Sequence, residues 1–148
     1  MLDKLTQEYD IDIGIHNHGP DDAQLGDWQA ILAAVQGFNP RVGTCDDTGH
    51  YFRADKNPIT AATKFGKRLH SIHLKAVNSA KNFVPIGTNG SLLDVVQLLR
   101  FLKKMEYPGI LAIEEEEQPD SPMAIIGKSV EAMRRFITTA NTIRLKSA

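Results

Sequence analysis

A strand–helix–strand unit can be read directly from residues 41–75, RVGTCDDTGHYFRADKNPITAATKFGKRLHSIHLK. Residues 41–47 and 71–75 have the short apolar and β-branched pattern that is typical of strands. A helix is predicted over 57–69, with Pro58 in the first turn, where a proline needs no backbone N–H. Two strands joined by a helix form a parallel βαβ unit with a right-handed crossover. This stretch therefore predicts an α/β fold.

The same alternation continues on both sides of this unit. The further elements predicted are helices over 2–9, 27–36, 91–105 and 121–139, and strands over 11–16 and 109–114. Asp27 and Ser91 are expected as N-caps, and Gly37 as the stop of the second helix. The chain is thus one domain over 1–148, a leading helix followed by four strand–helix units, and this regular architecture looks unfinished.

Composition limits the classes of function. The chain has 148 residues with 17 basic and 18 acidic side chains, which excludes a dominant electrostatic attraction to nucleic acid or anionic lipid. It has no apolar run near the ~20 residues of a membrane-spanning helix, and its amino terminus has no secretory signal pattern. The one cysteine cannot form an internal disulfide. We expect a cytoplasmic protein without nucleic-acid or membrane partners.

Residue types that bind metals stand at the carboxyl ends of all four predicted strands. They are His16, Asp47, His73 and Glu114. A single such residue is usually a solvated loop residue, but four on consecutive parallel strands favour a shared site, because strand ends meet at one edge of the sheet. Two imidazoles and two carboxylates suit manganese, cobalt, nickel or zinc better than calcium.

Several of these stretches resemble the motifs of one enzyme family. The resemblance rests on residues 15–20 (IHNHGP), 42–50 (VGTCDDTGH), 73–75 (HLK), 84–88 (VPIGT), 107–109 (YPG) and 113–114 (IE). In this order they resemble the sugar phosphate isomerase/epimerase family, whose members are xylose isomerase-like TIM barrels. The match is to the carboxyl-terminal half, the last four strands. The resemblance therefore implies four β/α units that form half of a TIM-type barrel.

The resemblance also implies a cofactor and its ligands. Asp47, His73 and Glu114 match metal ligands, and His16 stands where many relatives have a ligand glutamate. The family's well-understood epimerases transfer protons with two metal-bound glutamates, and only Glu114 matches that pair. Ala76 stands where an aspartate commonly follows the His-x-Lys motif. The implied cofactor is a divalent metal: manganese, cobalt, nickel, zinc or magnesium.

Catalytic roles are expected for Glu114, Lys75, His50 and Glu116. Lys75 shares a strand face with His73, and a buried lysine needs an anionic partner. Glu116 is two residues after Glu114, so in an extended chain it lies on the same face, and it is a second candidate acid or base. His50 lies three residues after the expected ligand aspartate, and we weigh a role in the site equally with plain packing.

Substrate contacts are expected from Asn17, His18 and Arg53, which border the predicted site. Asn17 and His18 could instead support the ligands, and surface arginines such as Arg53 are common without a role. Cys45 is interpreted as a small buried side chain. His70 is interpreted as a packing residue, because it is three residues from His73 and therefore falls on the opposite face of the strand.

A four-stranded half-barrel leaves two open sheet edges and an uncovered inner face, which favours association. The expected partner is a second copy, because two four-stranded halves complete eight strands around a two-fold axis. The alternatives are a separate amino-terminal partner, a longer protein of which this is a piece, or an open four-stranded sheet.

Three functions compete at this point. The first is metal-dependent isomerisation or epimerisation of a small sugar or sugar derivative, in which the metal polarises neighbouring oxygens. The second is metal-dependent hydrolysis in the same superfamily, against which the absence of a basic surface argues where the substrate is DNA. The third is a truncated metal-binding half-barrel without catalysis.

Overall fold

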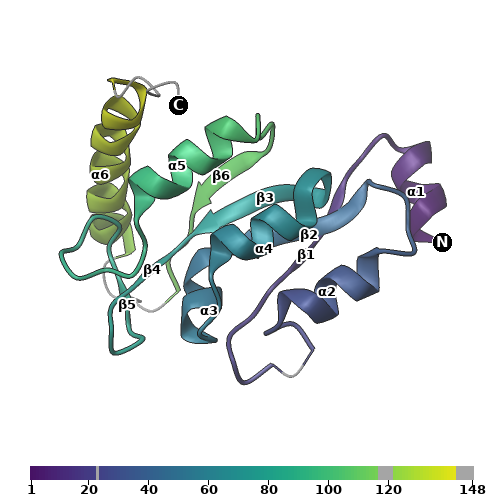
Figure 1. The fold of residues 1–148 in the computed structure, drawn as a ribbon, viewed down its shortest axis with the longest axis horizontal. Coiled ribbons are helices and arrows are strands. Elements are labelled where there is room, and N and C mark those ends of the chain that lie inside the picture. The colour runs from purple at the N-terminus through teal and green to yellow at the C-terminus, as the bar shows by residue number, and fades with distance from the viewer. Residues whose placement is uncertain (23, 117–121, 143–148) are drawn as a thin grey trace, which may run out of the picture.

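A parallel sheet of four strands, in the order β1-β2-β3-β6, forms the centre of the molecule (Figure 1). The strands are β1 Ile13–His16, β2 Val42–Asp47, β3 Leu69–Leu74 and β6 Ile110–Ile113. These positions come from a computed structural model that describes residues 1–22, 24–116 and 122–142. The α/β class and the parallel sheet agree with the sequence-based prediction.

The helices follow the predicted order, and the structure adds one short helix and one small β-hairpin. Their bounds are α1 Leu2–Glu8, α2 Trp28–Val35, α3 Thr48–Arg53, α4 Pro58–Phe65, α5 Val95–Lys104 and α6 Pro122–Thr142. The short helix α3 directly after β2 was not predicted. Nor was the small antiparallel hairpin of β4 (Ala76–Val77) and β5 (Phe83–Val84). Both additions lie in the chain that follows the carboxyl end of a sheet strand, where polar side chains gather.

Side-chain caps explain where most of these helices begin. Asp27 accepts a hydrogen bond from the Gln29 N–H at the start of α2, as predicted. The expected cap of α5 is wrong: Asp94, rather than Ser91, accepts from the Gln97 N–H. The expected stop of α2 agrees with the structure, in which Val35 ends the helix, Gln36 is its C-cap and Gly37 follows the cap, although Gly37 has no positive φ.

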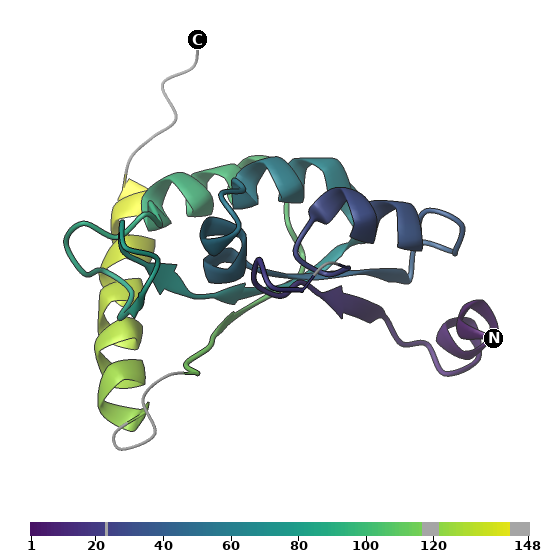
Figure 2. The ribbon, with the colours of Figure 1, turned by 90° about the horizontal axis from the view of Figure 1, so that it is seen from below.

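The two faces of the sheet differ. Helices α2, α4 and α5 lie together on one face, here called the outer face, as Figure 2 shows from below. The core is on that side, with Ile72 and Leu74 of β3 fully buried and Ile15 and Ile113 packed against them. No described helix lies flat on the opposite, inner face, and α6 stands across the β6 end of the layers (Figure 2).

The lengths of the helices bear on membrane association. Within residues 1–22, 24–116 and 122–142, no helix combines the length and the apolar character that crossing a bilayer requires.

Candidate metal centre

Four side chains meet at the carboxyl ends of the sheet strands. His16, Asp47, His73 and Glu114 each offer one ligand atom, and these atoms all lie within 4.8 Å of one another. His16 Nε2 lies 3.1 Å from His73 Nδ1 and 3.8 Å from Glu114 Oε2. The distance from His16 Nε2 to Asp47 Oδ2 is 4.0 Å, and His73 Nδ1 contacts Glu114 Oε2. The structure therefore brings the four predicted ligands together.

The chemistry of this cluster fits a divalent cation. Asp47 Oδ2 and Glu114 Oε2 are buried, and neither forms a well-aligned hydrogen bond with a described residue, although Asp47 Oδ2 is ion-paired with Lys75 Nζ and Glu114 Oε2 faces the two histidine rings. Buried carboxylate oxygens are costly without a cation or donor. Burial lowers the pKa of His16, which favours the neutral ring that binds metals. Two imidazoles with two carboxylates form a mixed nitrogen–oxygen set for a transition metal.

Lys75 links three carboxylates behind the centre. Its side chain is 3% exposed, and its Nζ lies 3.2 Å from Asp47 Oδ2 and 3.2 Å from Glu114 Oε1. Glu116 Oε2 is 2.8 Å away. Burial alone acts to lower the pKa of Lys75, but the surrounding carboxylates outweigh it and raise the pKa. Glu114 thus presents Oε2 to the histidines and Oε1 to a charged ammonium.

Two buried side chains fix the backbone at the strand ends. Asn17 Nδ2 donates to the Asp47 carbonyl at 3.0 Å, and Asn17 Oδ1 accepts from the Asp47 N–H at 2.6 Å. Thr48 Oγ1 donates to the Lys75 carbonyl at 2.8 Å and accepts from its N–H at 3.0 Å. Asp47 Oδ1 caps α3 by accepting from the His50 N–H, so that Oδ2 is left to face the centre. Asn17 is fully buried, and both polar atoms of its amide are engaged here.

A cavity of about 630 Å³ adjoins the centre. It is lined by His18, Gly19, Asp21, Asp22, Gln24, His50, Arg53 and Glu116. His50 Nε2 is 3.6 Å from Glu116 Oε2, and burial lowers the pKa of His50. Three residues expected around the site, His18, His50 and Arg53, therefore share one hollow with Glu116.

Phe83, from the unpredicted hairpin, packs among the cationic residues of this region. The centre of its ring lies 5.0 Å from Lys75 Nζ and 5.2 Å from Arg53 Cζ. The His50 ring meets it edge-on, with centroids 5.8 Å apart. Sequence reasoning missed Phe83 because nothing in its local pattern distinguishes it from a packing aromatic.

Asp46 is a second buried carboxylate, on the opposite face of β2. Thr44 Oγ1 donates to Asp46 Oδ1 at 2.6 Å, and the Tyr51 hydroxyl donates to the same oxygen at 3.3 Å. Burial raises the pKa of Asp46 to about 7. It points toward the helices, as the strand alternation from Asp47 requires.

Cys45 lies on the inner face with His16 and His73, and the ligand atoms of these three also fall within 4.8 Å of one another. The cysteine is buried, and burial raises the pKa of its thiol. A protonated buried thiol agrees with the expected packing role.

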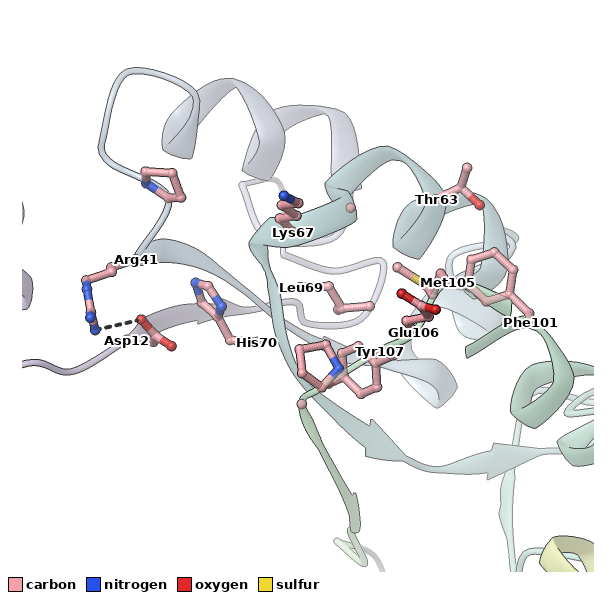
Figure 3. A pocket seen from close by; sticks show the side chains of 14 residues that line it. Asp12, Arg41, Thr63, Lys67, Leu69, His70, Phe101, Met105, Glu106 and Tyr107 are labelled. Carbon is pink, nitrogen blue, oxygen red and sulfur yellow. Dashed lines mark hydrogen bonds and ion pairs between the residues drawn. The ribbon is translucent and has the colours of Figure 1, made fainter. Parts of the chain in front are cut away.

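A larger cavity of about 940 Å³ lies at the amino-terminal edge of the sheet (Figure 3). Its lining includes Tyr107, His70 and the ion pair of Arg41 Nη1 with Asp12 Oδ1 at 3.4 Å. This edge is opposite the one that carries the four ligand residues, so the cavity is separate from the centre.

Comparisons with known proteins agree with this architecture. Residues 1–136 match a family described as xylose isomerase-like TIM barrel. The chain is 29% identical to an uncharacterised Bacillus subtilis protein, YfiH, over 74% of this chain and 42% of that protein. It is 25% identical to the inosose dehydratase of Bacillus velezensis, over 80% of this chain and 45% of the enzyme. The chain thus spans less than half the length of these relatives.

The chain covers slightly more than half of each of two solved structures. A D-tagatose 3-epimerase-like protein superimposes with a TM-score of 0.76 at 22% identity, covering 93% of this chain and 51% of that one. An L-ribulose 3-epimerase superimposes with a TM-score of 0.74 at 14% identity, covering 99% of this chain and 56% of that one. At these identities the similarity concerns the fold. The fold is therefore half of a TIM-type barrel, as predicted.

Proposed function

Because the chain belongs to the xylose isomerase-like TIM-barrel family, we propose that it supplies the metal-binding half of an isomerase or epimerase that acts on small sugars or sugar derivatives. The observation that carries the proposal is the convergence of His16, Asp47, His73 and Glu114 within 4.8 Å. A divalent cation held there would polarise the carbonyl and hydroxyl oxygens of a bound sugar. Among the relatives are an inosose dehydratase, a D-tagatose 3-epimerase-like protein and an L-ribulose 3-epimerase, which support this substrate class.

Proton transfer is assigned to the carboxylates. Glu114 faces the centre with one oxygen, and Glu116 lies beside it at the mouth of the cavity, held by Lys75 at 2.8 Å. Moving a proton to or from a carbon next to a carbonyl needs a base within reach of that carbon. Lys75 and the buried His50 would stabilise the negative charge that develops on the substrate oxygens.

Substrate contacts are assigned to the open side of the centre. His18 and Arg53 line the adjoining cavity and can reach a bound sugar. Asn17 is fully buried against the backbone of Asp47, and its contribution would be to hold that ligand in place. Because Cys45 is buried as a free thiol, a reducing cytoplasm suits the protein.

A second copy is the proposed partner. The edge strands β1 and β6 begin next to exposed apolar residues, with Ile11 just before β1 and Ile110, 71% exposed, at the start of β6. Pairing β1 of one copy with β6 of the other would satisfy both edges and cover both inner faces. Light scattering at low micromolar concentration should give twice the chain mass. A monodisperse single-chain mass would reject this assembly.

The activity is tested by solvent-deuterium exchange. Metal-loaded protein in deuterated buffer should incorporate deuterium at the carbon next to the carbonyl of a ketohexose such as D-fructose, as NMR would show. Glu114→Gln should abolish the exchange, whereas Glu106→Gln, which alters a carboxylate at the opposite edge of the sheet, should not. Bound metal without exchange over a panel of ketoses, aldoses and their acidic derivatives would leave only a metal-binding role.

A further inference from the structure

Arg53 is a cation without a protein partner. It ends α3, and its guanidinium lies over the Phe83 ring, with Cζ 5.2 Å from the ring centre. It makes no hydrogen bond or ion pair with any residue in the described part of the chain. Its side chain is half-buried and lines the cavity beside the metal centre. A guanidinium in this position leaves its donors available to a ligand.

His50 supplies a second polar group in the same cavity, and its contact with a protein charge is the 3.6 Å approach of Nε2 to Glu116 Oε2, which leaves Nδ1 facing the cavity. Its side chain is 8% exposed, and neither ring nitrogen has a hydrogen-bond partner among the described residues. A buried polar side chain in this state needs an explanation, and a ligand in the adjoining cavity provides one. The ring also meets Phe83 edge-on, which fixes its orientation.

Nitrogen atoms of these two residues converge at Gly19. A Cβ atom built on Gly19 would lie 3.6 Å from Arg53 Nη1 and 3.6 Å from His50 Nδ1. Gly19 does not have a positive φ, so its backbone alone does not require glycine. The missing side chain instead leaves space between two nitrogens where a ligand oxygen can bind.

The carboxylates that line the cavity disfavour an anion with two charges. Glu116 is paired with Lys75, and Asp22 accepts from the Gln24 and Leu25 N–H groups at 2.9 and 2.8 Å. Asp21 adds a third carboxylate. A phosphate, with two charges, would be repelled by these groups more strongly than a carboxylate, with one. A planar carboxylate also matches the paired donors of a guanidinium.

We propose that Arg53 and His50 form a carboxylate subsite next to the metal centre, so that the substrate is an acidic sugar, a sugar acid or uronate. This inference rests on the proposed function for the position of the sugar, and it adds the class of substrate. The reacting carbons would face the four metal ligands, and the carboxylate would occupy the space above Gly19.

Binding of three matched probes tests the subsite. Metal-loaded protein should bind D-glucuronate at least about tenfold more tightly than D-glucose, measured by calorimetry, since an arginine–carboxylate pair adds strong charge-assisted hydrogen bonds. D-glucose 6-phosphate should bind less tightly than D-glucuronate. Equal binding of glucose and glucuronate, tighter binding of the phosphate, or no binding of glucuronate would overturn the proposal.

Variants separate this subsite from the rest of the site. Arg53→Gln should remove the preference for glucuronate without loss of bound metal, and Arg135→Gln, on the exposed surface of α6, should keep it. Gly19→Ala should also weaken glucuronate binding, because its methyl group makes only ordinary contacts with the protein but fills the space between the two donors. A full preference for glucuronate in Arg53→Gln would contradict the assignment. Glucuronate binding without deuterium exchange would reject the proposed catalysis while leaving the subsite intact.

Discussion

Replacing Asn17 by alanine should destabilise the protein through the backbone of Asp47. The substitution removes a donor at 3.0 Å and an acceptor at 2.6 Å, and it leaves the buried carbonyl and N–H of Asp47 without partners. Each unsatisfied buried group costs about 1–3 kcal/mol, so the two groups together should lower the free energy of unfolding by about 2–6 kcal/mol. Urea unfolding at a fixed protein concentration measures this loss.

Asn78→Ala provides the matched control for Asn17→Ala. Asn78 Oδ1 also bonds two backbone groups, the Ala80 and Asn82 N–H at 3.0 and 3.1 Å, but these hydrogen bonds are exposed to solvent. Water can replace them, so the control should lose less than about 1 kcal/mol. Metal affinity should fall in Asn17→Ala and remain unchanged in the control. Equal losses of stability in the two variants would refute the argument that burial of the Asp47 backbone sets the cost.

Two further predictions concern ionisable groups. Burial raises the pKa of Asp46 from 3.8 to about 7. Between these two values the folded state keeps a proton that the unfolded state releases, so the free energy of unfolding falls as pH rises from about 4 to about 7. Asp46→Asn should reduce this fall in the free energy of unfolding, measured by urea unfolding at several pH values between about 4 and 8. An unchanged pH dependence of stability in Asp46→Asn would contradict the role given to Asp46. Burial acts to raise the pKa of Glu116, but the contact of Glu116 with Lys75 outweighs burial and lowers that pKa. Lys75→Met should therefore raise the pKa of Glu116 in carboxyl NMR titrations, whereas Lys75→Arg, which keeps the positive charge, should not. A Glu116 titration unaffected by Lys75→Met would show that the ion pair does not govern it.

The parts of the fold that follow from strand alternation could be predicted. His16, Asp47 and His73 are each the last inward-facing residue of a parallel strand, so the period of two and the common strand direction place them together. Glu114 follows β6 in the same register, since His73 pairs with Ala112 two residues earlier. The convergence of the four ligands thus depends on backbone geometry that the pattern encodes.

The parts that depend on local irregularity could not be predicted. The β2–β3 register shifts beside Thr44, which is paired with Leu69, whereas Cys45 is paired with Ser71. His70 is therefore an extra residue whose direction simple parity cannot give. Its ring nitrogen lies next to Gly43, where any Cβ would clash. Ser91 is not the cap of α5 because its Oγ accepts from the Leu93 N–H, in a turn before the helix begins.

The arrangement around Arg53 was also beyond the sequence pattern. The aromatic ring beneath it comes from Phe83, in a hairpin of two-residue strands with no clear periodicity. Contacts of this kind join segments about thirty residues apart, and only the packed structure brings them together.

Metal content measured by equilibrium dialysis followed by elemental analysis tests the central claim most directly. The full chain, dialysed against manganese, cobalt or zinc, should bind one ion per chain through His16, Asp47, His73 and Glu114. His73→Ala and Glu114→Ala should each lose most of the bound metal, while Glu106→Ala, at the opposite edge of the sheet, should retain it. Undiminished metal in both ligand variants would contradict the assignment of these strand ends as a metal centre.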